Sequence, residues 1–103
     1  MKRNIPIPHK KLTEFCLKWK ITELSLFGSV LRDDFSHDSD IDILVSFSPD
    51  ARRTLFDLVE MRDELINIFG RDVDLVSRKG LETSRNHLRK EAILSTAEVV
   101  YAS

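Results

Sequence analysis

The sequence has little cysteine, glycine or proline, and it has no long apolar run. Cys16 is the only cysteine, which excludes an internal disulfide. No apolar stretch approaches the roughly 20 residues that cross a membrane, and the basic start MKRNIPIPHK lacks the apolar core of a signal peptide. We therefore expect a globular protein of the cytoplasm that does not enter a membrane.

The sequence also lacks an excess of either charge. Its 16 Lys and Arg against 17 Asp and Glu give a formal net charge of -1, without the basic excess that usually accompanies nonspecific nucleic-acid binding. We expect no direct contact with nucleic acid. The 103 residues suit one domain, residues 1–103, and are too few for a catalytic domain plus a separate substrate-binding domain. Any larger substrate is therefore expected to be held by a partner.

Apolar residues recur with helix spacing in some segments and form strand-like runs in others. Leu12, Phe15, Cys16 and Trp19 fall on one face of a helix that Pro8 is suited to open. Strands are predicted over 21–27, 40–47 and 72–77, with a last edge strand over 97–103. Helices are predicted over 54–69, before Gly70, and through Leu88 and Ile93. This order predicts an α+β fold, a small mixed sheet backed on one face by helices.

Two aspartates, Asp40 and Asp42, begin the second predicted strand. Side chains alternate between the two faces of a strand, so both aspartates point one way while Ile41, Ile43 and Val45 point the other way into the core. Two like charges about 7 Å apart at the backbone can converge on one cation. The pattern therefore favours a cation site on the face opposite the core.

Two other interpretations of these aspartates are a calcium loop and an exposed edge strand. A calcium loop begins D-x-D-x-D-G, but Ile43 stands where that loop needs glycine and Pro49 where it needs a closing glutamate. This interpretation fails. The other is an exposed edge strand that starts with surface carboxylates, with Ser36 and Ser39 capping turns. From the aspartates alone, the edge strand stays open beside the cation site.

The dipeptide Gly28-Ser29 ends the first predicted strand and adds a second kind of signal. Glycine permits close approach of a phosphate, and backbone N–H groups with a hydroxyl bind anions. The later segment VDL places Asp74 on a neighbouring strand as a third carboxylate, with Asp72 as the second choice. GS, then D-x-D after ten residues, then this third aspartate together predict a nucleoside triphosphate site with a metal clamp.

With these motifs the sequence resembles the minimal nucleotidyltransferases of the DNA polymerase beta superfamily, whose signature is GS, ten residues, then D-x-D. Gly28-Ser29 and Asp40-Ile41-Asp42 stand in that register. The resemblance extends over nearly the whole chain and also includes Arg32, Ser39, the VDLV run with Asp74, and the closing LRKEAILSTAEVVYA.

The resemblance implies a nucleotidyltransferase fold, ATP as substrate and two Mg²⁺ ions as cofactors. It assigns Asp40, Asp42 and Asp74 to the metal ions and to catalysis, and the following residues to the nucleotide: Gly28, Ser29, Arg32 and Ser39. Small bacterial and archaeal proteins of this kind resemble the antitoxin half of HEPN and MNT toxin-antitoxin pairs. That likeness implies transfer of AMP to a tyrosine of a HEPN ribonuclease partner, in a hetero-oligomer with it.

Two other functions stay open. Leu31 and Asp33 replace a small residue and a glycine that members often carry around the arginine, which would suit an antitoxin that acts by contact with a vestigial site. A nucleotidyltransferase for a small molecule such as an aminoglycoside is the other, although such enzymes usually need extra chain to bind the drug.

Overall fold

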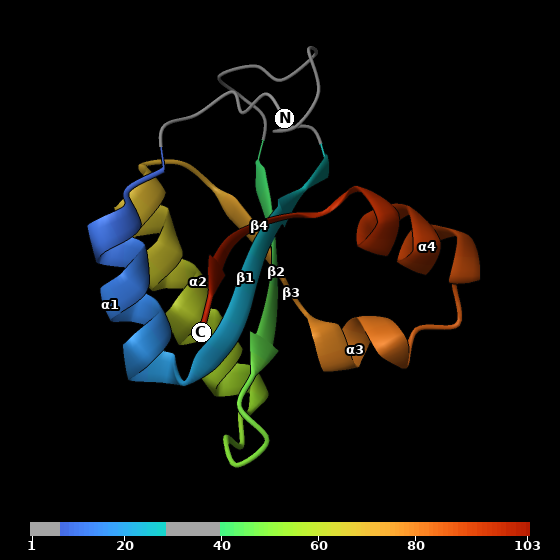
Figure 1. Ribbon diagram of the computed structural model, residues 1–103, viewed down its shortest axis with the longest axis horizontal. Coiled ribbons are helices and arrows are strands. Elements are labelled where there is room, and N and C mark those ends of the chain that lie inside the picture. The colour runs from blue at the N-terminus through green and yellow to red at the C-terminus, as the bar shows by residue number, and fades with distance from the viewer. Residues whose placement is uncertain (1–6, 29–39) are drawn as a thin grey trace.

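The computed structural model describes residues 7–28 and 40–103, and its centre is a mixed sheet (Figure 1). Within these residues four strands lie in the order β3-β2-β1-β4. Their bounds are Ile21–Phe27 for β1, Ile41–Phe47 for β2, Val73–Ser77 for β3 and Glu98–Ala102 for β4. Strand β1 is antiparallel to β2 and β4, whereas β2 is parallel to β3. The predicted α+β class with a small mixed sheet is confirmed, and β4 is the edge strand that was expected.

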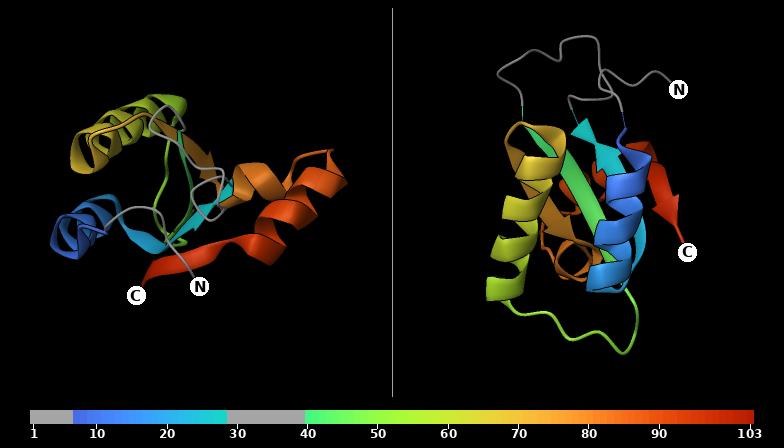
Figure 2. Two further views of the ribbon diagram at one scale, coloured as in Figure 1. Left: turned by 90° about the horizontal axis from the view of Figure 1, so that it is seen from above. Right: turned by 90° about the vertical axis from the view of Figure 1, so that its left-hand side faces the viewer.

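Two helices, α1 (His9–Trp19) and α2 (Leu55–Phe69), cover one face of the sheet (Figure 2). Helix α1 begins directly after Pro8, whose fixed φ suits the start of a helix. The side chains predicted to face the core are buried there, and they join the main cluster of buried residues: Leu12, Phe15, Cys16, Trp19, Ile21, Leu24, Leu26, Ile41, Ile43, Val45, Met61, Leu65 and Val73. This layer supplies most of the buried apolar surface of the described fold.

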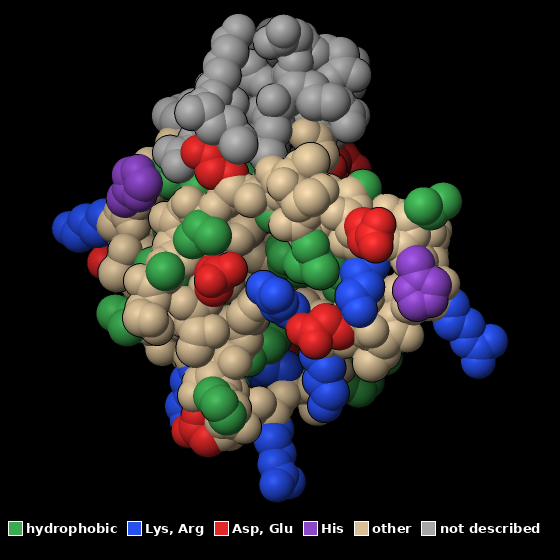
Figure 3. Space-filling view, turned by 45° about the vertical axis from the view of Figure 1, so that its right-hand side comes forward, with side chains coloured by type: hydrophobic (Ala, Val, Ile, Leu, Met, Phe, Trp, Pro, Cys, Tyr) green, Lys and Arg blue, Asp and Glu red, His purple; other side chains and the backbone are tan. Residues whose placement is uncertain are grey.

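The other face of the sheet carries a smaller cluster, which corrects the expectation that helices back one face alone. Helices α3 (Arg78–Glu82) and α4 (His87–Thr96) lie on this side. Leu81 and Ile93 from these helices pack against Phe27 and Leu44 of the sheet. Lys, Arg, Asp and Glu side chains lie interspersed on the outer surface of this side (Figure 3). The sheet is therefore covered on both faces, and α3 was not predicted.

Helix α2 has a clear start signal at its first turn and a clear stop signal after its last turn. At its start, the Thr54 hydroxyl accepts a hydrogen bond from the Asp57 N–H (3.2 Å), and the Asp57 carboxylate accepts one from the Thr54 N–H (3.0 Å). This reciprocal pair satisfies two backbone donors that a helix start leaves open. At its end, Gly70 takes a left-handed conformation with φ 73°. The predicted bounds are confirmed, with Thr54 as the cap rather than the first helical residue.

We expect Thr54→Ala to lower the free energy of unfolding by about 1 kcal/mol, because it removes the hydroxyl that caps α2. Urea denaturation followed by circular dichroism measures this difference. Thr13→Ala is the matched control, since Thr13 is exposed inside α1 and alanine favours a helix interior. An equal loss in both variants would contradict the capping argument.

No helix among residues 7–28 and 40–103 is both long and apolar enough to span a membrane.

Candidate functional site

The register between β2 and β3 places Asp42 directly beside Asp74. Adjacent strands lie about 4.8 Å apart, and residues paired across a parallel ladder point to the same face. Asp42 is half-buried and Asp74 is exposed, whereas the neighbouring Ile41 and Ile43 are fully buried in the main cluster on the opposite face. The predicted alternation along β2 is confirmed for these residues. The ladder thus holds two carboxylates side by side on the face away from α1 and α2.

Gly28 lies against the Asp42 carboxylate at the end of β1. Its backbone φ is +75°, and a Cβ atom added there would stand 2.1 Å from Asp42 Oδ2 and 3.1 Å from Cγ. Phe27, just before it, is paired with Asp42 across the antiparallel ladder. Because Gly28 has no side chain, the Asp42 carboxylate can occupy this position. Gly28, just after β1, and Asp74, on β3, therefore lie on either side of Asp42.

Asp40 and Asp72 each precede a strand rather than belong to one. The predicted second strand includes Asp40, but β2 begins at Ile41, and Asp40 is exposed just before it. The Asp72 carbonyl accepts a hydrogen bond from the Ile41 N–H (2.9 Å), so this backbone joins the two strand ends. Asp74, the first choice from the sequence, is the one that the register sets beside Asp42. The catalytic roles of all these aspartates stay predictions.

The remaining predicted nucleotide-binding residues, Ser29, Arg32 and Ser39, lie outside the described residues. The same holds for Leu31 and Asp33, the two departures from the family pattern.

The two carboxylates at this site suit Mg²⁺ better than they suit a metal ion whose ligands all come from the protein. Among the described residues no group of three or more His, Cys, Asp and Glu side chains is placed to hold a metal ion. Mg²⁺ usually keeps several waters and binds to one or two carboxylates together with substrate phosphates. Asp42 and Asp74 supply two carboxylates on one face. They fit a magnesium ion that shares its ligands with a nucleotide.

Cys16 is not part of this site. It lies in the main core cluster, and burial raises the pKa of its thiol to about 12. A thiol with such a pKa is protonated at neutral pH and is a poor nucleophile. The prediction that Cys16 is buried rather than nucleophilic is confirmed.

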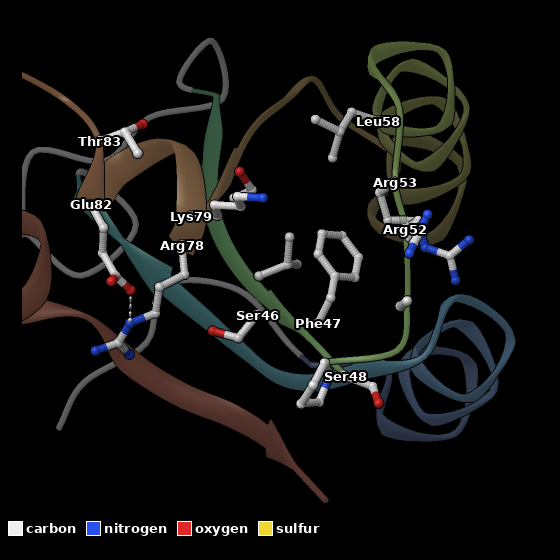
Figure 4. Close-up of a pocket in the computed structure, with 14 residues that line it drawn as sticks. Ser46, Phe47, Ser48, Arg52, Arg53, Leu58, Arg78, Lys79, Glu82 and Thr83 are labelled. Carbon is white, nitrogen blue, oxygen red and sulfur yellow. Dashed lines mark ion pairs between the residues drawn. The ribbon is translucent and has the colours of Figure 1, made fainter.

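A hollow of about 800 Å³ lies toward the other end of β2 (Figure 4). Four basic side chains line it, and we call it the basic hollow: Arg52, Arg53, Arg78 and Lys79. Arg52 and Arg53 come from the segment before α2, whereas Arg78 and Lys79 come from α3 on the opposite side of β2. No pattern in the sequence predicts this hollow, because its two walls are distant in sequence and share no motif.

The nucleotidyltransferase domain family matches residues 9–99 of the sequence. The chain belongs to this family. The resemblance indicated by GS and D-x-D is confirmed, and the chain is a minimal nucleotidyltransferase. This nucleotidyltransferase is 35% identical over 80 residues to the protein adenylyltransferase MntA of Thermococcus cleftensis, covering 78% of this chain and 77% of the relative.

Two solved structures show the fold that this nucleotidyltransferase shares. A toxin-antitoxin structure with AMP-PNP superposes with a TM-score of 0.71 at 21% identity, over 94% of this chain and 75% of the other. A tri-AMPylated Shewanella oneidensis HEPN toxin in complex with MNT antitoxin gives a TM-score of 0.63 at 20% identity, over 92% of this chain and 70% of the other. At these identities the likeness establishes the fold.

Proposed function

We propose that this nucleotidyltransferase transfers AMP from ATP to a hydroxyl group of a HEPN-domain toxin and thereby acts as its antitoxin. Tyrosine is the proposed acceptor residue. The observation that carries the proposal is the pairing of Asp42 with Asp74 beside Gly28. The adenylyltransferase activity named for the Thermococcus relative supports it, as does the modified HEPN toxin in the Shewanella complex. Residues 1–103 would act as one domain in the cytoplasm, with the acceptor supplied by the partner.

In this transfer the protein acts mainly by positioning the reactants and by neutralising charge. The acceptor oxygen forms a bond to the α-phosphorus of ATP, the bond from that phosphorus to the bridging oxygen breaks, and pyrophosphate leaves. Asp40, Asp42 and Asp74 would hold magnesium, which when bound neutralises charge on the triphosphate. Asp74 is exposed, so its carboxylate is accessible to take the proton from the acceptor hydroxyl.

The sequence after Gly28 supplies the other residues of the proposed site. Ser29, Arg32 and Ser39 are proposed to bind the nucleotide, the serines through hydroxyl groups and the arginine through its positive charge. Gly28 contributes by keeping the Asp42 carboxylate close to the end of β1, since any larger residue would occupy the position of that carboxylate.

The test is intact mass spectrometry of the HEPN-domain protein after incubation with this chain, ATP and Mg²⁺. We expect a gain in whole AMP units. The Asp40→Asn, Asp42→Asn double variant is the control, and it should give no gain. If the partner co-purifies with this chain but gains no mass, the proposed AMP transfer is wrong, and an antitoxin that acts by contact is favoured. Pyrophosphate release that depends on an aminoglycoside, without any protein partner, would point to the small-molecule alternative.

A further inference from the structure

The first turns of α2 expose a group of large apolar side chains. Leu55, Phe56 and Val59 are 80%, 87% and 58% exposed, and we call them the α2 patch. Leu55 and Val59 are four residues apart and are therefore neighbours on the helix surface. Single exposed apolar residues are ordinary, but several together mark an interaction surface. The α2 patch is therefore suited to bind a partner that contributes apolar side chains.

The α2 patch continues into the basic hollow. Leu58 lines the hollow, and Leu55 lies one helical turn before it on the same face of α2. Arg52 and Arg53, on the same wall, precede the helix by two or three residues. Through Leu55, the apolar surface of the α2 patch thus adjoins the positive charge of the hollow at the start of α2.

Positive charge dominates the lining of the hollow, which has four basic side chains and a single carboxylate, Glu82. Glu82 already pairs with Arg78 (3.4 Å), as the dashed line in Figure 4 marks. No carboxylate of the described residues forms an ion pair with Arg52 or Lys79, both of which are exposed. These two cations are therefore available to an anionic ligand.

Arg53 gives the hollow a fixed wall. Its guanidinium donates a hydrogen bond to the Trp19 carbonyl and lies over the Trp19 ring at 5.1 Å and the Phe47 ring at 5.8 Å. Its Nε is buried and has no hydrogen-bond partner among the described residues. These contacts hold the Arg53 guanidinium against the two rings, and its positive charge stays at the wall of the hollow.

We infer that the α2 patch and the basic hollow together form a docking site for an acidic, amphipathic segment of the protein partner. Carboxylates of that segment would enter the hollow beside Arg52 and Lys79, and its apolar side chains would cover Leu55 and Val59. A flat anionic membrane does not reach cations that line a hollow, and a nucleic-acid backbone offers phosphates but little apolar surface. This inference rests on the proposed function, because the partner is the protein that is modified.

The docking site leaves the aspartates accessible. Ser46 lines the hollow and lies four residues along β2 from Asp42, a distance of about 13 Å at the rise of a strand. A partner held at the hollow would have to extend about this far along β2 for its acceptor hydroxyl to reach Asp42. Separate surfaces for holding and for modifying the partner follow from this arrangement.

The test measures the dissociation constant for the HEPN-domain protein, without nucleotide, by isothermal titration calorimetry. We expect Leu55→Ala, and separately the Arg52→Glu, Lys79→Glu double variant, to raise the dissociation constant about tenfold or more. Leu88→Ala on α4 is the control for losing an exposed apolar side chain, since Leu88 is 82% exposed. Lys10→Glu, Lys11→Glu on α1 is the control for the same change in charge. Both controls should bind like the wild type.

The outcomes separate this inference from the proposed function. If the wild type binds and the docking variants do not, while no AMP is transferred, the docking site stands and the transfer is wrong. If AMP is transferred and the docking variants bind like the wild type, the docking site is wrong and the transfer stands. The docking inference is also overturned if the wild type does not bind the HEPN-domain protein. Loss of binding to phosphatidylglycerol vesicles or to a single-stranded RNA instead, in the same variants, would overturn it as well.

Discussion

Asp42→Asn is expected to lower kcat/KM for AMP transfer about a thousandfold, a loss of about 4 kcal/mol in transition-state stabilisation. Asparagine preserves the shape of the side chain but removes the negative charge that would hold a magnesium ion beside Asp74. The fold should tolerate the change, because Asp42 is half-buried rather than part of either apolar cluster. Initial rates of AMP transfer at saturating and limiting ATP measure the effect.

The neighbouring aspartates supply the comparison for this prediction. Asp74→Asn should also reduce transfer, by about a hundredfold, because Asp74 is paired with Asp42 in the β2–β3 ladder. Asp72→Asn is the matched control and should stay within about threefold of the wild type, since Asp72 precedes β3 and the register does not set it beside Asp42. A large loss for Asp72→Asn with none for Asp74→Asn would exchange the two assignments.

Gly28→Ala is expected to reduce transfer about a hundredfold, because displacement of a catalytic group by about 1 Å has effects of that size. The added Cβ would stand 2.1 Å from Asp42 Oδ2, so the carboxylate must move away from its position beside Asp74. The left-handed backbone, with φ +75°, adds strain of about 1 kcal/mol for any residue with a Cβ. Transfer rates and the free energy of unfolding should therefore both fall.

Gly70→Ala separates the two effects of that substitution. Gly70 has nearly the same backbone conformation, with φ +73°, but nothing lies within 4 Å of the position of its added Cβ. We expect it to lose about 1 kcal/mol of stability and to keep wild-type transfer. If Gly70→Ala lost as much activity as Gly28→Ala, strain in the fold rather than displacement of Asp42 would explain both.

Local signals in the sequence were sufficient for most of the elements. Pro8, Gly28 and Gly70 each act within one turn of chain, and each stands at the element boundary where it was predicted. The alternation along β2 is also local, because the backbone alone sends successive side chains to opposite faces. These features depend on neighbours in sequence, which is why they could be predicted without the fold.

Contacts between distant segments could not be predicted from the sequence. The cover on the second face depends on Leu81 and Ile93 meeting Phe27 and Leu44, and no spacing rule joins residues so far apart. The parallel pairing that selects Asp74 over Asp72 is of the same kind, since a shift by two residues would preserve the face but change the neighbour of Asp42. The flanking apolar residues favoured Asp74, but only the register sets it beside Asp42.

The opposite directions of alternate residues in β2 also have a consequence for engineering the protein. Ile41, Ile43 and Val45 meet α1 and α2, whereas Asp42 points to the other side of the sheet. Melting temperature can therefore be raised by repacking the α1 and α2 layer, with the reacting groups left untouched. A thermostable variant and a variant with a new acceptor would be sought on different faces of the same strand, and their substitutions should combine additively.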